Sequence, residues 1–261
     1  MSLSNRQLKY LSSLSQKKYR QKHRQCLVEG LRLCEEAIPS DWPLRELYVT
    51  EDFANQTNAD RVLGMAGEKH LSPVTVSTAD MERITDTRNS QGIAVLADLP
   101  EPQIFHPDPN SHPQVLLLDG ISDPGNLGTL LRSADWFGVR EMVLGPGSVE
   151  WSNPKVMRAS MGAVFRITAY DITSWNDVFE QLHGANFSIV TADMNGQALT
   201  EFSPTLPWAL LLGNEAHGIS AKLAKQSDIA VTIPGSGPAD SLNVAMAGTV
   251  LLYELTSSVN F

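Results

Sequence analysis

Residues 116–139 read LLLDGISDPGNLGTLLRSADWFGV, an apolar run followed by a glycine-containing loop and a helix-like segment. Strand, loop and helix in this order are typical of a phosphate-binding loop, and Gly120 and Gly125 have the spacing of the two glycines of a Walker A loop. That loop continues with a lysine for the phosphates and a Ser or Thr for magnesium, but Asn126 and Leu127 stand there instead. The stretch therefore predicts the first strand and helix of an α/β domain, and it excludes a Walker A site.

The second half of the chain continues this alternation of apolar strands and helices. Strands are predicted at 114–120, 141–147, 163–169, 187–194, 208–214 and 228–234, with helices between them and a last helix over 241–255. Strands that are apolar along their whole length are typical of a mainly parallel sheet covered by helices on both faces. The predicted fold class is therefore α/β.

A proline-rich stretch separates this region from the first part of the chain. Residues 98–114 contain five prolines in seventeen positions, too many for a helix interior or a central strand. Before it, helix and strand patterns alternate over the length of a small α/β domain. We predict a domain over 1–98, a linker over 99–113 and a second domain over 114–261.

The charge of the chain is divided unevenly between its parts. The net charge is −9, yet residues 1–45 hold nine Lys or Arg and four Asp or Glu, which gives +5 and leaves −14 for the remainder. The segment QKKYRQKHRQ at 16–25 contains five cations and no acid, with Tyr19 able to stack on a base. An RNA-binding segment and a solvated helix face both fit this pattern.

Several classes of protein and site are excluded by composition. No apolar run approaches the roughly 20 residues of a membrane helix, and the amino terminus lacks the apolar stretch of a signal peptide. Cys26 and Cys34 form no CxxC motif or Cys/His cluster, so they are interpreted as reduced core thiols. We expect a cytoplasmic protein with no membrane segment and no metal.

Three loops at predicted strand ends have unusual sequences. In the first, Asn126 begins a helix and Arg132 follows about two turns later; a helix cap and an ion pair with Asp135 are the simpler readings. The second, GNEAHG over 213–218, also fits a plain turn. The third, IPGSGPADSLNV over 233–244, contains two glycines and two prolines before an apolar helix.

The third loop also has a simpler reading, in which Ser241 is only the cap of the helix that follows. Taken together and in this order, however, the three loops resemble the signature motifs of the SpoU (TrmH-like) branch of the SPOUT RNA methyltransferases. The segment KVMRASMGAVFRI over 155–167 also fits that family, so the resemblance covers roughly 112–261. The basic amino-terminal domain resembles, more weakly, the ribosomal-protein-like RNA substrate-binding module that precedes many of these catalytic domains.

The resemblance implies a fold and an activity. It implies a parallel sheet with a carboxy-terminal trefoil knot, a homodimer, S-adenosylmethionine as methyl donor, and a ribose 2′-hydroxyl of structured RNA as acceptor. The separate amino-terminal module favours ribosomal RNA over transfer RNA. A non-catalytic RNA-binding or ribosome-assembly factor is the main alternative, and a nicotinamide-dependent oxidoreductase is disfavoured because no GxGxxG opens the second domain.

The resemblance also implies roles for individual residues. The catalytic set is Arg132, Asn126, Glu215, Ser241 and Asn243. The cofactor-binding set is Leu212, Gly213, Gly218, Ile233, Ser241 and Leu242. The RNA-binding set, drawn from the basic segment and from the stretch at 155–167, is Lys17, Lys18, Arg20, Lys22, Arg24 and Arg158. His217 is a rival general base, and Lys155 and Arg166 add positive charge nearby.

Overall fold

A computed structural model describes residues 3–87, 90–215, 217–238 and 241–257 of the chain. Its backbone forms two compact units, one of residues 1–101 with 152–165 and one of residues 102–151 with 166–261. The segment 152–165 thus belongs with the amino-terminal unit although it lies in the second half of the sequence. The domain bounds at 98 and 114 stay a prediction. They did not include segment 152–165 in the amino-terminal unit.

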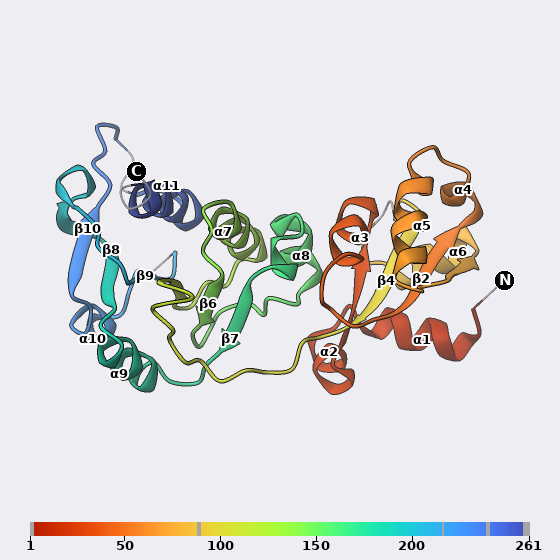
Figure 1. Cartoon of the computed structure of the whole chain (residues 1–261), viewed down its shortest axis with the longest axis horizontal. Coiled ribbons are helices and arrows are strands. Elements are labelled where there is room, and N and C mark those ends of the chain that lie inside the picture. Colours follow the sequence, from red (N-terminus) through yellow and green to blue (C-terminus); the bar gives the residue numbers. More distant parts are fainter. Residues whose placement is uncertain (1–2, 88–89, 216, 239–240, 258–261) are drawn as a thin grey trace. The chain divides into compact units, whose positions relative to one another are not determined.

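The amino-terminal unit is a four-stranded sheet with helices on both faces (Figure 1). Its elements are α1 (Asn5–Ser13), α2 (Lys17–His23), β1 (Gln25–Glu29), α3 (Leu31–Ala37), β2 (Leu44–Thr50), α4 (Glu51–Ala54), α5 (Ala59–Glu68), β3 (Pro73–Val76), α6 (Thr78–Ile84), β4 (Ile93–Asp98), α8 (Pro154–Ser160) and the 3-10 turn η1 (Ala163–Phe165). The strand order is β1-β4-β2-β3, with β4 antiparallel to both neighbours.

Apolar residues at helical spacing fix the helices on this sheet. Leu8 and Leu11 of α1 and Met81 of α6 are buried with Tyr48 and Leu96 of the sheet in one core cluster. Ser4 begins α1 with a capping box, in which its side chain and that of Gln7 bond reciprocally to the backbone. The unit therefore has its own apolar core.

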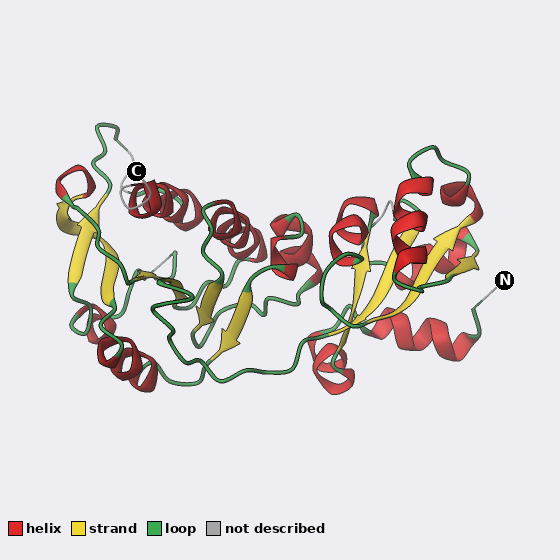
Figure 2. Cartoon of the chain, in the orientation of Figure 1, coloured by secondary structure: helices red, strands yellow, loops and turns green. Residues whose placement is uncertain are grey.

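The second unit is built on a six-stranded, entirely parallel sheet (Figure 2). Its elements are β5 (Gln114–Leu118), α7 (Pro124–Trp136), β6 (Glu141–Leu144), β7 (Thr168–Asp171), α9 (Asn176–Gly184), β8 (Ser188–Ala198), η2 (Leu199–Glu201), β9 (Trp208–Leu212), α10 (Ala221–Ala224), β10 (Ile229–Thr232) and α11 (Val244–Ser257). The α/β fold with a mainly parallel sheet is confirmed, whereas the trefoil knot stays a prediction.

Strand order explains how distant loops are brought to one place. The order is β10-β8-β9-β5-β6-β7, so β5 and β9 lie side by side although about 90 residues separate them in sequence. All six strands run in the same direction, and their carboxyl ends therefore meet at one edge. In Figure 1, α7 and α11 lie on one side of this sheet and α9 on the other.

The bounds predicted for the strands and helices were less accurate than the predicted types of these elements. The strand predicted at 163–169 begins only at Thr168, because 163–165 form a 3-10 turn, and the last helix begins at Val244 rather than at Ser241.

Cys26 and Cys34 are buried free thiols, and burial raises the pKa of Cys26 to about 12. Both are therefore protonated core residues at neutral pH.

We expect Gly145→Ala to destabilise the second unit for a steric reason. A Cβ at Gly145 would lie 2.4 Å from the Cζ2 atom of Trp175, whose indole Nε1 donates a hydrogen bond of 2.7 Å to Asp119 Oδ1. The new methyl group must displace the ring, and such overpacking costs about 1–3 kcal/mol in the free energy of unfolding. Urea denaturation measures the loss.

Gly184→Ala is the matched control, because no described atom lies within 4 Å of a Cβ at this last residue of α9. The free energy of unfolding should stay unchanged or rise by up to about 1 kcal/mol, since alanine favours helix. Equal losses in the two variants would contradict the steric explanation.

Candidate functional site

Three loops meet at the carboxyl edge of the parallel sheet, and Asn126 joins them. The side-chain Nδ2 of Asn126 donates to Glu215 Oε1 at 2.7 Å, and its Oδ1 accepts from Asn243 Nδ2 at 3.0 Å. Glu215 is 89 residues away in sequence and Asn243 is 117. Three residues of the predicted catalytic set are therefore in direct contact.

Asn126 is available for these contacts because another residue caps its helix. The N-cap of α7 is Asp123, whose side chain accepts from the backbone N–H of Asn126 at 2.9 Å, and Pro124 occupies the first turn. The reading of Asn126 as a helix cap is wrong. Asp123 itself was missed in the sequence, although an Asp directly before a Pro is a typical helix start.

The second loop is a tight turn closed on itself. Asn214 and Gly218 exchange two backbone hydrogen bonds, of 3.1 and 2.8 Å, and Gly218 has a φ of +65°. The Nδ2 of Asn214 donates to Gly120 O at 2.8 Å, which ties this turn to the loop after β5. A Cβ at Gly213 would lie 2.5 Å from the Gly218 backbone, so the turn itself requires that glycine.

The third loop ends in a residue that has two functions. The Oδ1 of Asn243 accepts from the backbone N–H groups of Ala245 at 2.9 Å and Met246 at 3.3 Å, which caps α11. Its Nδ2 remains for Asn126. The reading of Ser241 as the cap is therefore wrong; Ser241 is exposed, and residues 239–240 of this loop lie outside the described part of the chain.

Arg132 lies on α7 with its side chain exposed to solvent. It makes no hydrogen bond or ion pair with any residue that the structure describes. The carboxylate of Asp135 is occupied by Arg140 and by Arg166, whose Nη2 lies 2.8 Å from Oδ2, so the expected pair of Arg132 with Asp135 is wrong. No described residue occupies the guanidinium of Arg132, so this part of the chain leaves it open to a ligand.

Asp135 is held as an anion by these two partners. Burial would raise the pKa of its carboxyl, but the hydrogen bonds and charges of Arg166 and Arg140 outweigh burial and lower it. Arg166 is thereby neutralised in part, and it is a weaker candidate for a phosphate contact than its sequence position indicates.

The six residues expected to hold the cofactor differ in exposure. Leu212 and Gly213 are buried at the end of β9, and Ile233 is half-buried after β10. Gly218, Ser241 and Leu242 are exposed, and Leu242 keeps 51% of its surface accessible. An exposed leucine in the third loop and a tight turn in the second can supply apolar contacts and backbone hydrogen-bonding groups to a ligand.

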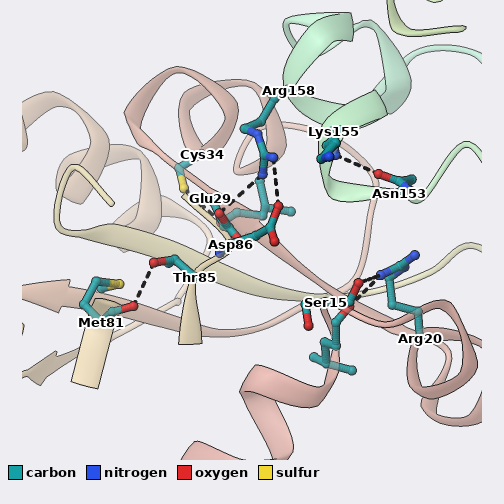
Figure 3. Close-up of polar contacts among 12 residues, drawn as sticks. Ser15, Arg20, Glu29, Cys34, Met81, Thr85, Asp86, Asn153, Lys155 and Arg158 are labelled. Carbon is teal, nitrogen blue, oxygen red and sulfur yellow. Dashed lines mark hydrogen bonds and ion pairs between the residues drawn. The ribbon is translucent and has the colours of Figure 1, made fainter. Parts of the chain in front are cut away.

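The predicted RNA-binding cations fall into two groups. Lys17, Lys18 and Lys22 are exposed on α2. Arg20 is only 1% exposed, and its Nη1 donates to the carbonyl oxygens of Leu14 at 2.8 Å and Ser15 at 2.7 Å (Figure 3). Arg20 therefore holds the α1–α2 connection, and its expected contact with RNA is wrong because the side chain is buried.

Two further arginines of that set are also engaged. Arg24 ends α2 with a φ of 51°, donates to Leu99 O at 3.3 Å and forms an ion pair with Glu101. Arg158 forms ion pairs with Glu29 and Asp86, which leaves it little freedom to bind phosphate. Sequence alone gave no signal that separates these cations from the exposed lysines.

Besides Asp123, a further residue of the loop network, Ser148, escaped the sequence analysis. The Oγ of Ser148, in the loop after β6, accepts from Ile121 N at 3.1 Å and donates to Leu118 O at 3.3 Å. A small polar residue in the loop of the neighbouring strand is the only signal that could have indicated it.

Within the described ranges, no three His, Cys, Asp or Glu side chains gather as metal ligands, and no helix is long and apolar enough to span a membrane.

Comparison with known families accounts for both parts of the chain. Residues 113–253 match the SpoU rRNA Methylase family, and residues 5–95 match the MRM3-like substrate binding domain. The first match covers the parallel sheet, with all three loops, and the second covers most of the amino-terminal unit.

Individual relatives resemble the chain over almost its whole length. The 23S rRNA (guanosine(2553)-2′-O)-methyltransferase RlmP of Bacillus subtilis is 32% identical over 257 residues, which are 97% of each chain. The AdoMet-bound rRNA methyltransferase of Sinorhizobium meliloti superposes with a TM-score of 0.82 at 27% identity, covering 100% of this chain and 98% of that one. The SpoU methyltransferase AviRb of Streptomyces viridochromogenes, in complex with AdoMet, gives 0.83 at 25% identity, with 97% and 98% covered. This chain belongs to the SpoU rRNA methylase family.

Proposed function

We propose that this enzyme transfers the methyl group of S-adenosylmethionine to a ribose 2′-hydroxyl of ribosomal RNA in the cytoplasm. The observation that carries the proposal is the contact of Asn126 with Glu215 and Asn243, which assembles the three family loops at one sheet edge. The similarity to a relative named as a 23S rRNA 2′-O-methyltransferase supports ribosomal RNA over transfer RNA. A non-catalytic factor would not require this network.

The turn over 213–218 and the loop over 233–243 would hold the cofactor, with backbone groups of Gly213 and Ile233 on the adenine and Leu242 against its face. When bound, S-adenosylmethionine supplies a methyl group on a sulfonium, ready for in-line attack by an oxygen. Glu215 accepts the amide of Asn126 and is thereby fixed in orientation. We assign Asn126, Glu215, Ser241 and Asn243 to orienting the ribose and the loops.

Arg132 would stabilise the negative charge that develops on the ribose oxygen during the transfer. A guanidinium stays protonated in proteins, so it does not serve as a base. Its fork can hold the phosphate next to the target ribose and stabilise the alkoxide charge as it develops, while the proton leaves to phosphate or water. The free guanidinium on α7 supports this role.

We expect Arg132→Ala to lower methyl transfer by a factor of about 100 to 1000, the cost of removing one preorganised charge from a transition state. Arg132→Lys should recover little, because an ammonium lacks the planar fork. The assay incubates the enzyme with labelled S-adenosylmethionine and total cellular RNA and maps the modified ribose. The affinity for S-adenosylmethionine, measured by calorimetry, should not change.

Two outcomes would overturn these assignments. Absence of any labelled ribose with the unaltered enzyme would remove the proposed function. Near-normal turnover of Arg132→Lys, together with complete loss in His217→Ala, would give the central role to the rival base His217.

RNA affinity would come mainly from the exposed face of α2. Lys17, Lys18 and Lys22 present three cations there, and Tyr19 lies parallel to His23 with ring centroids 6.4 Å apart. Cations bind the phosphate backbone regardless of sequence, and the aromatic rings offer a surface on which an unpaired base can stack. This face lies in the part of the chain that matches the substrate binding domain.

We expect Lys17→Gln and Lys22→Gln each to weaken RNA binding and to reduce the slope of log K against log salt by about one, the loss of one phosphate contact. Fluorescence anisotropy over a salt series measures both quantities. Lys69→Gln, the same charge change on another helix terminus of the unit, is the control. A slope unchanged by the α2 substitutions would contradict this assignment.

We infer that the enzyme is a homodimer that pairs through α11 and the end of α7. Met246, Val250 and Tyr253 are 63%, 40% and 57% exposed and recur at helical spacing on α11. Tyr253 contacts Phe137, with ring centroids 6.0 Å apart, and the adjacent Trp136 is 85% exposed. An apolar stripe of this length is typical of an interface.

Substituting both Met246 and Tyr253 by Glu should convert the dimer to a monomer, because two charges would be buried without partners. Light scattering coupled to gel filtration measures the mass. Met194→Glu, at an exposed methionine of β8, should leave the mass unchanged. A monomeric unaltered enzyme would remove this part of the proposal.

A further inference from the structure

The segment 152–165 connects two strands of the catalytic sheet but belongs to the substrate-binding unit. The chain leaves the second unit after Trp151 and returns to it at Arg166. Between these points Asn153 caps α8 by accepting from Lys155 N at 2.9 Å, and Phe165 packs edge-on against Trp42, with ring centroids 4.8 Å apart. The segment is therefore capped and packed as part of the amino-terminal unit.

An ion cluster with one buried member, Glu29, and two partly exposed members, Asp86 and Arg158, fixes this segment. Glu29, at the end of β1, is 7% exposed, and its Oε1 accepts from Asp86 N at 2.8 Å. Arg158 of α8 places Nη1 3.5 Å from Glu29 Oε2 and Nη2 3.0 Å from Asp86 Oδ2 (Figure 3). Burial raises the pKa of Glu29, although the Asp86 N–H and the Arg158 charge oppose that rise.

The charge of this cluster excludes a role as a phosphate site. Two carboxylates surround one guanidinium, and both terminal nitrogens of Arg158 face a carboxylate. A polyanion gains nothing from a cation that is already neutralised. Arg158 therefore acts on the protein rather than on RNA.

The preceding stretch of chain is bonded to the candidate catalytic loops. In the loop after β6, Ser148 accepts from Ile121 N at 3.1 Å and Val149 N donates to Ile121 O at 2.8 Å. Gly120, next to Ile121, receives the Asn214 side chain. One continuous segment, 145–165, is thus bonded at its start to the active-site loops and at its end to the substrate-binding unit.

We propose that Arg158 is a positioning residue, which anchors segment 152–165, the path by which the chain returns to the catalytic sheet, to Glu29 and Asp86 and thereby acts on methyl transfer without touching RNA or cofactor. The proposal rests on the function proposed above. It assigns to Arg158 an effect on the rate of transfer, not on RNA affinity.

Glu29→Gln and Arg158→Gln test the proposal together. Each should lower kcat by about tenfold or more, because a small misplacement of a bound substrate is costly. The affinities for RNA and for S-adenosylmethionine should stay unchanged, as should the salt slope of RNA binding. The double variant should be no slower than either single one, since both substitutions break the same contact.

Glu29→Gln also distinguishes an anchoring role of Arg158 from a direct contact of Arg158 with RNA, because the two roles predict different changes in kcat. If Arg158 bound phosphate, removing the neighbouring anion would leave RNA binding intact or strengthen it and would not lower kcat. Only an anchor predicts a slower enzyme after the loss of a buried carboxylate. Arg158→Lys, which keeps one charge near Glu29 but loses the fork, should recover part of the rate.

Glu35→Gln is the matched control, with the same substitution at a carboxylate of α3 that pairs with Arg32 and Arg61 in the same unit. It should keep the normal kcat. If the Glu29 and Arg158 variants lower only the melting temperature while kcat stays normal, the anchor is merely structural and the inference fails. If the unaltered enzyme methylates no RNA, the proposed function fails instead.

Discussion

The hydrogen bonds of one amide, that of Asn126, connect the loops on which the site depends. Glu215 accepts from its nitrogen and Asn243 donates to its oxygen, so both polar ends of the side chain are used. An amide presents a donor and an acceptor in one plane, whereas a carboxylate in its place would repel Glu215 and offer no donor. The contact in turn requires that β5 and β9 be adjacent, which the strand order provides.

The arginines of the chain have different functions, because they contact different partners. Arg20 satisfies backbone carbonyls, Arg166 binds Asp135, and Arg158 joins two carboxylates. Arg132 alone among these four has no partner within the described residues. A fixed guanidinium beside an acid stabilises the fold, while an exposed one on α7 without a partner among the described residues can respond to a substrate.

Much of the fold and part of the site could be predicted from the sequence. Apolar strands alternating with helices indicated the parallel sheet, and the ordered loops around Asn126, Glu215 and Asn243 indicated the family. Helix starts were less certain, because Asp123, Asn126, Ser241 and Asn243 all have side chains that can cap a helix. Only the observed hydrogen bonds identify Asp123 and Asn243 as the caps.

The amino-acid sequence by itself determined the chemical inventory: two α/β parts, three loops with family motifs, and a basic segment before an acidic remainder. Tertiary structure alone decided which cations remain free, because Lys17 and Arg20 are three residues apart yet one is exposed and the other is buried under carbonyls. It also placed 152–165 with the amino-terminal unit. Burial and pairing depend on contacts between residues distant in sequence, such as Glu29 with Arg158, and no local pattern encodes those contacts.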